Sequence, residues 1–136
     1  MATPMPLREP TFLILTALAR EPMHGYGIIS DVAALSGGRL ALRPGTLYGA
    51  LDRLTDEGLV EREHEEVVEG RLCRYYRLTE AGRSVLTAET ERLRRNVEAA
   101  TQRLRARPAV GGTAGSPANT PGTAARPILR PTGGPA

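Results

Sequence analysis

The chain has 136 residues, which is enough for one compact domain with a modest core. It contains one cysteine and two histidines, which argues against disulfide scaffolds and structural zinc. No apolar run approaches the roughly 20 residues of a membrane-spanning helix, and the first residues lack a basic segment followed by an apolar stretch. We therefore expect a soluble cytoplasmic protein without membrane contact, metal or cofactor.

The basic residues are all arginines, 18 in number, and the formal net charge is +3. Arginine suits bidentate contacts to phosphate and to guanine, but the same bias also arises in proteins of GC-rich genomes. All 15 acidic residues precede residue 108, so this part of the chain is nearly neutral. If it binds a polyanion, its charges must be separated between faces.

The composition changes abruptly at Pro108. From there to Ala136 the chain consists almost entirely of Gly, Pro, Ala, Thr and Ser, with Arg126 and Arg130 as its only charges. This composition predicts a disordered tail over residues 108–136. The preceding chain is expected to form an N-terminal domain over residues 1–78 and a C-terminal helix over residues 79–107.

Two short helices are predicted near the N-terminus. The apolar run from Phe12 to Leu18 indicates a core helix that closes before Pro22. A second helix is predicted from about Gly25 to Leu35, and His24 is expected to cap it or pack beside it. Its buried face is expected to consist of Tyr26, Ile29, Val32 and Leu35.

A third helix is predicted to start at Pro44, because proline suits a first helical turn, and to stop at Gly58. Three leucines at spacings of four and three should face inward, namely Leu47, Leu51 and Leu54. The outward face is expected to carry Thr46, Tyr48, Gly49, Asp52 and Arg53.

Two strand-like runs follow, Leu59 to Val67 and Arg71 to Leu78, and the turn signal Glu69-Gly70 between them predicts a β-hairpin. The first strand is acidic, whereas the second carries arginines. Tyr75 and Tyr76 point to opposite faces of a strand, so at least one of them is expected in the core.

Thr79 is a good N-cap for a last helix. The apolar residues of this helix form one stripe on an otherwise charged surface, and they are Leu86, Leu93, Val97, Ala100 and Leu104. Because a lone stripe needs a partner surface, we expect it to mediate dimerisation.

Several short motifs together resemble the signature of the PadR family of transcriptional regulators over about Leu7 to Leu86. These are His24-Gly25-Tyr26-Gly27-Ile28, Gly45-Thr46-Leu47-Tyr48, Leu51-Asp52-Arg53-Leu54, Glu57-Gly58-Leu59-Val60, Gly70-Arg71, Arg74-Tyr75-Tyr76-Arg77-Leu78-Thr79 and Gly82. One position departs from the pattern, because Gly49 follows Tyr48 where many relatives have proline.

The resemblance implies a mainly α fold with a small β-hairpin wing, a winged helix-turn-helix followed by a C-terminal dimerisation helix. It also implies a homodimeric regulator of the short C-terminal type, usually a repressor, that binds a palindromic DNA operator and is often released by a small ligand. The recognition helix would correspond to Gly45 to Leu54 and the wing to Glu61 to Arg77. No effector can be named from the residues.

A helix enters the major groove with its N-terminal residues nearest the base edges, which makes the start of the third helix the expected reader. We expect DNA contacts from Arg43, Gly45, Thr46 and Tyr48, a phosphate contact from Arg53 on the same side of the helix, and wing contacts from Arg71 and Arg74. For Arg74 and Arg77, ion pairs with the acidic first strand are an equally favoured alternative to contacts with DNA.

Three other classes compete with this interpretation. A MarR-like regulator is disfavoured by the His-Gly-Tyr and Gly-Thr-Leu-Tyr motifs. A protein-interaction winged helix that does not bind DNA stays open, because Asp52 and the near-neutral charge are compatible with it. An enzyme is least favoured, since we find no nucleophile with a matching base, no glycine-rich phosphate loop and no metal-ligand spacing.

Overall fold

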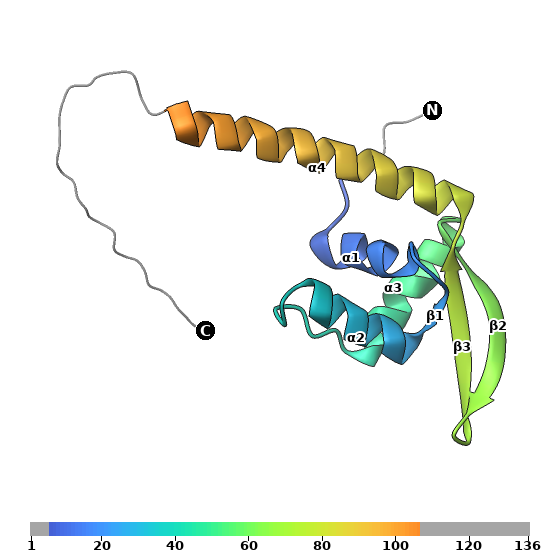
Figure 1. The fold of residues 1–136 in the computed structure, drawn as a ribbon. Helices are drawn as coiled ribbons and strands as arrows, with labels where there is room; N and C mark the ends of the chain where they lie inside the picture. Colours follow the sequence, from blue (N-terminus) through green and yellow to red (C-terminus); the bar gives the residue numbers. More distant parts are fainter. Residues whose placement is uncertain (1–5, 107–136) are drawn as a thin grey trace. The chain divides into compact units, whose positions relative to one another are not determined.

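The computed structural model describes residues 6–106. They form four helices and three strands in the order α1 (Glu9–Leu18), β1 (Met23–His24), α2 (Gly25–Leu35), α3 (Pro44–Asp56), β2 (Val60–Val68), β3 (Arg71–Leu78) and α4 (Glu80–Ala106) (Figure 1). The tail expected at residues 108–136 lies outside the described residues. Within residues 6–106 no helix is long and apolar enough to cross a membrane.

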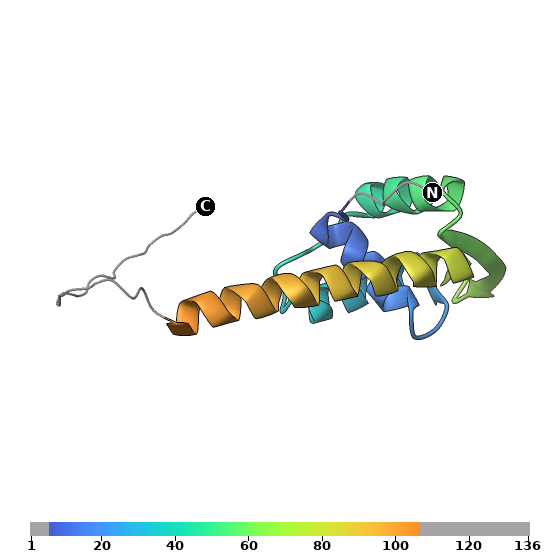
Figure 2. The ribbon, with the colours of Figure 1, turned by 90° about the horizontal axis from the view of Figure 1, so that it is seen from above.

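The chain divides into two units within α4, after Arg94. The first unit contains α1 to α3, the three strands and the first half of α4, and the described part of the second is the remainder of α4. In the first unit, the hairpin of β2 and β3 lies at one end of the cluster of α1, α2 and α3 (Figures 1 and 2).

The core lies between α1, α2, α3 and the base of the sheet, as the apolar spacing predicts. The inward leucines of α3 are at most 2% exposed. They pack with Ile14, Leu15 and Leu18 of α1 and with Val60, Tyr76 and Leu78 of the sheet. The expectation that one of the two adjacent tyrosines is buried is confirmed, since Tyr76 is 1% exposed.

The bounds of α2 agree with the prediction, but its buried face differs. Ile28 and Val32 are fully buried, whereas Tyr26 is 56% and Leu35 48% exposed. Tyr26 precedes Ile28 by two positions, so it lies about 200° around the helix from it. The expectation that Tyr26 and Leu35 face the core is therefore wrong, and only Ile29 of the other expected residues joins Val32 there.

The wing is an antiparallel hairpin, as predicted, and its turn is Glu69-Gly70. Both turn residues have positive φ, 53° and 78°, which is the geometry of a two-residue type I′ turn. Two features were not predicted. β1 pairs with the edge of β3 that faces away from β2, and a bulge lies in β2 between Arg62 and His64. The sheet order is therefore β1-β3-β2.

The start of α4 is fixed by Thr79 and Gly82. The Thr79 hydroxyl accepts a hydrogen bond from the Gly82 amide at 3.0 Å and donates one to the Gly58 carbonyl at 2.7 Å, which confirms the predicted N-cap. A Cβ on Gly82 would lie 2.1 Å from the carbonyl oxygen of Leu59. Glycine is therefore required for α4 to approach the chain that enters β2.

A buried carboxylate joins the N-terminal segment to the first half of α4. Glu89 is 7% exposed, accepts a hydrogen bond from the Leu7 amide at 3.0 Å, and is held by Arg92 through bonds of 2.9 and 2.6 Å. The bonds from Arg92, and to a lesser extent that from Leu7, keep the pKa of Glu89 below its ordinary value despite burial. This ion pair was not predicted from the sequence.

Candidate nucleic-acid interface

The exposed face of α3 is the surface that the sequence predicts to read DNA. All five residues expected to face outward are exposed: Thr46, Tyr48, Gly49, Asp52 and Arg53. Arg43 is the N-cap residue of the helix and is exposed as well. At about 100° per residue, the middle of this face consists of Gly45, Gly49, Asp52 and Asp56, with two glycines in its first turns and two carboxylates in its last.

Tyr48 and Arg53 lie at opposite borders of that face. Five residues separate them, which rotates their side chains apart by about 140°. Tyr48 faces α2 and β3, whereas Arg53 faces α1. Arg53 therefore shares a side with Thr46 but not with Tyr48, and the expectation that all three lie on one side is wrong for Tyr48.

Tyr48 lies directly on Gly25 at the start of α2. A Cβ on Gly25 would come within 2.2 Å of the Tyr48 hydroxyl oxygen. The ring is still 37% exposed, and partial burial raises the pKa of its hydroxyl, so the group is a neutral hydrogen-bond donor near pH 7. This contact links the His-Gly-Tyr motif to the Gly-Thr-Leu-Tyr motif.

Beside Tyr48 the structure contains a cavity of about 290 Å³, called here the wing-side cavity. It lies between the start of α2, α3 and β3, and its lining residues are His24, Gly25, Tyr26, Tyr48, Arg71, Leu72, Cys73 and Arg74. The lining contains guanidinium and hydroxyl donors and no carboxylate. His24 also caps α2, because its Nδ1 accepts a hydrogen bond from the Gly27 amide at 3.0 Å.

The three arginines of β3 differ in their partners. Arg74 bonds Glu65 through Nε at 3.0 Å, which raises the Arg74 pKa, and Arg77 forms an ion pair with Glu61. Arg71 lies over the ring of Tyr26, with its guanidinium carbon 6.0 Å from the ring centre. Among the described residues Arg71 has no ion pair, so of these three arginines it is the one whose charge is open to a partner.

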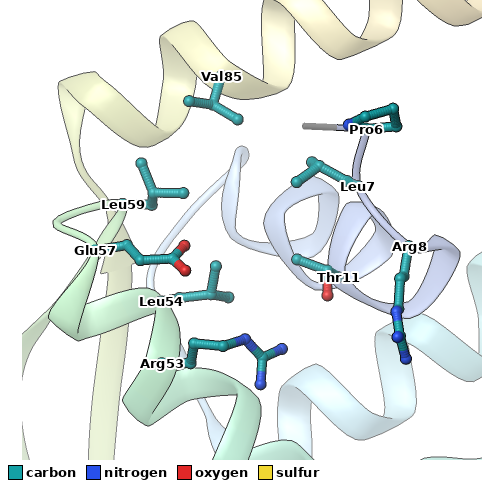
Figure 3. Close-up of a pocket in the computed structure, with 9 residues that line it drawn as sticks. All are labelled: Pro6, Leu7, Arg8, Thr11, Arg53, Leu54, Glu57, Leu59 and Val85. Atoms are coloured by element: carbon teal, nitrogen blue, oxygen red, sulfur yellow. The ribbon is translucent and has the colours of Figure 1, made fainter. Parts of the chain in front are cut away.

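A second, larger hollow of about 600 Å³ lies on the other side of α3, and it is called here the α1-side groove (Figure 3). Arg53 and Glu57 extend from the end of α3 toward Arg8 and Thr11 across it. Its apolar lining consists of Pro6, Leu7, Leu54, Leu59 and Val85. Unlike the wing-side cavity, this groove contains a carboxylate.

The apolar stripe of α4 changes character along the helix. Leu86 packs against the core of the first unit and Leu93 is half-buried. In the second unit Val97 is 64% and Leu104 81% exposed, and Ala100 is exposed too. The residues expected to mediate dimerisation thus include large apolar side chains that the described chain leaves uncovered.

Sequence reasoning missed Tyr26 as a surface residue and Glu89 as a buried one. The signal for Tyr26 was present in the spacing of Ile28 and Val32, which excludes it from the buried stripe. The signal for Glu89 was also present, because it lies three residues after Leu86 and four before Leu93, on the apolar face of α4, whereas the other acidic residues of this helix lie on the opposite face.

Residues 14–88 match the sequence profile of the Transcriptional regulator PadR-like family. The chain is 40% identical over 80 residues to Transcriptional regulator Rv3488 of Mycobacterium tuberculosis, covering 59% of this chain and 71% of that protein. It is also 40% identical over 91 residues to an uncharacterized protein of transposon TN4556 from Streptomyces fradiae, covering 67% of this chain and 25% of that protein. The chain thus spans only a quarter of the transposon protein.

Solved structures of the family have the same fold. PadR of Bacillus subtilis in complex with operator DNA superposes with a TM-score of 0.53 at 26% identity, over 60% of this chain and 46% of that one. A PadR family regulator from Eggerthella lenta superposes with a TM-score of 0.56 at 26% identity, over 68% and 78%. A family of regulators also agrees with the expectation that the chain is not an enzyme. The chain therefore belongs to the PadR-like family of transcriptional regulators.

Proposed function

We propose that this chain binds a palindromic DNA operator as a homodimer in the cytoplasm and represses transcription there. The observation that carries the proposal is the exposed first part of α3, bounded by donor groups and lying beside Arg71, the arginine of β3 that has no ion pair among the described residues. Family membership supports it, since a relative of this fold was solved with its operator DNA.

The start of α3 is the element that we assign to the major groove. Arg43, Thr46 and the backbone at Gly45 lie at its N-terminal end, where a recognition helix comes closest to base edges. Tyr48 and Arg53 lie at its two borders, where the two DNA backbones that flank the groove would run. We therefore assign base readout to the first three and phosphate contacts to Tyr48 and Arg53.

The wing contributes Arg71 first. Arg74 is held by Glu65 through Nε alone, so its terminal nitrogens remain available as donors to a phosphate. The acidic strand β2 holds Arg77 as well, and we assign no DNA contact to it.

The homodimer is proposed from the stripe of α4. Leu93, Val97 and Leu104 recur at the spacing of a helix-pairing seam, and Val97 and Leu104 are the most exposed large apolar residues of this helix. Two copies joined there would place two recognition helices for two half-sites about one DNA turn apart.

The dimer is tested by Leu93→Glu, with Ala88→Glu as the matched control on an exposed position of the same helix. Light scattering should give a dimer for the wild type and the control and a monomer for Leu93→Glu, because a charge in the seam is costly to bury. An unchanged mass for Leu93→Glu contradicts the proposal.

Release by a small ligand is proposed at the α1-side groove. The groove combines an apolar lining with Arg8, Arg53 and Glu57, which suits an amphipathic molecule with polar ends. Because Arg53 is also a proposed phosphate contact, a ligand that engages it would compete with DNA. A ligand found by its stabilising effect on the wild type should lose that effect on Arg53→Gln; an equal shift in both proteins rules out this location.

DNA binding itself is tested by the salt dependence of affinity for the promoter upstream of the chain's own gene. Arginine contacts to phosphates release counterions, so the logarithm of the binding constant should fall steeply with the logarithm of salt concentration. Absence of binding, or binding that does not change with salt, favours the competing assignment to a protein-interaction winged helix, which the exposed Asp52 and Asp56 would suit.

A further inference from the structure

The wing-side cavity has no role in the fold or in base readout. We propose that it holds one phosphate of the DNA backbone, where the strand passes between α3 and the wing, and that Tyr26 is a contact residue there. The inference rests on the proposed DNA binding and adds to it a defined phosphate seat and a residue that the sequence placed in the core.

The chemistry of the lining favours a phosphate. Tyr48 contributes one hydroxyl, and Tyr26 contributes a second hydroxyl on a residue that is 56% exposed. Arg71 adds a charged donor with no carboxylate partner in the described chain. A phosphate presents only acceptor oxygens, so a site with donors and without carboxylates is complementary to it.

The position of the cavity favours a DNA phosphate over a free one. Tyr48 belongs to α3, the helix assigned to the major groove, and Arg71 begins β3 at the tip of the wing, which we place at the neighbouring minor groove. The sugar-phosphate backbone between two adjacent grooves must cross the space between those two elements. The cavity lies in that space, because its lining comes from both elements.

Tyr26 lines the proposed phosphate site together with Tyr48 and Arg71. Its ring lies beneath the guanidinium of Arg71, at the outer limit of a cation–π contact, and so restricts where that charge can move. Tyr26 is 56% exposed, so its hydroxyl is accessible to a phosphate at the cavity.

The test compares Tyr26→Phe and Arg71→Gln with two matched controls in the full chain. Tyr75→Phe removes a hydroxyl from β3 outside the cavity, and Arg77→Gln removes an arginine already paired with Glu61. The probes are a duplex selected by the wild type from a random-sequence pool and an unrelated duplex of equal length. Thermal melts check that all four variants are folded.

Tyr26→Phe should weaken binding to both duplexes by the same factor, about 3- to 10-fold, because a phosphate contact carries no sequence information. Arg71→Gln should weaken both and lower the salt slope by about one. The two controls should bind within about twofold of the wild type.

Neutral methylphosphonates placed one at a time along the selected duplex then locate the contact. Neutralising any contacted phosphate should weaken the wild type, but at one position in each half-site the loss should be smaller for Tyr26→Phe than for the wild type, because the variant already lacks one donor to that phosphate. Two outcomes would overturn this inference and leave the proposed function standing. One is that Tyr26→Phe binds DNA as tightly as the wild type; the other is that the loss from Tyr26→Phe and the loss from the methylphosphonate add at every phosphate position. A wild type that retains no duplex overturns the proposed function together with it.

Discussion

Gly82 at the start of α4 and Gly49 in the middle of α3 are both helical glycines, but only one of them is explained by the chain itself. Gly82 has a backbone carbonyl oxygen 2.1 Å from where its Cβ would be. Around Gly49 no atom of the surrounding structure lies within 4 Å of that position. A glycine within a helix costs about 0.5 to 1 kcal/mol relative to alanine, so Gly49 weakens the free protein without an internal compensation.

This difference separates two kinds of surface in the molecule. Where α4 leaves the sheet, each unusual residue is matched by a contact inside the chain, as Thr79 is by Gly58 and Gly82 by Leu59. On the exposed face of α3 Gly49 has no such match, and beside the wing-side cavity Tyr26 and Arg71 meet only each other, at a distance of 6.0 Å. Features of the second kind are the ones that a bound partner would explain.

The largest effect is expected for Gly82→Ala. Its new Cβ would collide with backbone, which cannot move aside as a side chain can, so α4 and the start of β2 must separate. We expect a loss of about 3 kcal/mol or more in the free energy of unfolding. Urea denaturation measures it, and a loss below about 1 kcal/mol would show that the close approach is not required. Gly45→Ala is the matched control, because a Cβ at Gly45 would have open space around it. Gly38→Ala is not suitable, because Gly38 has positive φ.

A smaller loss is expected for Glu89→Gln, which keeps the shape of the side chain and removes its charge. The variant weakens the bonds that Glu89 accepts from Arg92 and Leu7, and we expect a loss of about 1 to 3 kcal/mol at neutral pH. Glu91→Gln is the matched control, since Glu91 is exposed on the same helix.

The loss should depend on pH in a defined direction. The folded-state pKa of Glu89 lies below its ordinary value of 4.5, so the carboxylate stabilises the fold above that value, and the contribution disappears as the pH falls through the folded-state pKa. Wild type and Glu89→Gln should therefore converge in stability on acidification. A difference that stays constant below pH 4.5 would mean that the ion pair is not its source.

The smallest change in stability is expected for Gly49→Ala, and it has the opposite sign. The free protein should gain about 0.5 to 1 kcal/mol, whereas affinity for a selected duplex should fall about tenfold, because a methyl group would keep α3 away from the groove floor. Anisotropy titration and urea denaturation of one preparation give both values. Unchanged affinity with raised stability would assign Gly49 no part in DNA binding and would weaken the comparison above.

The sequence predicts most of the fold because its elements are marked by local rules. The inward leucines of α3, the Thr79 cap and the Glu69-Gly70 turn each follow from residue type and spacing, and each is found as expected. The two-residue strand β1 is too short to produce a pattern. It exists only because β3 offers it a free edge.

The candidate site was less predictable because it depends on rotation about helix axes and on pairing across elements. Arg53 was expected beside Tyr48, but five helical residues rotate the two apart. The sequence left two roles open for Arg74 and Arg77, and the register of β2 with β3 aligns them with Glu65 and Glu61, which form the ion pairs. Tyr26 was assigned inward from its residue type, although the spacing of α2 turns it outward.

Sequencing the duplexes that the purified full chain retains from a random pool tests the central claim most directly. A homodimer with α3 of each copy in the major groove predicts an inverted repeat whose half-sites are about 10 base pairs apart or a multiple of that. A retained pool without enrichment, or one enriched in a single unrepeated site, would contradict the account.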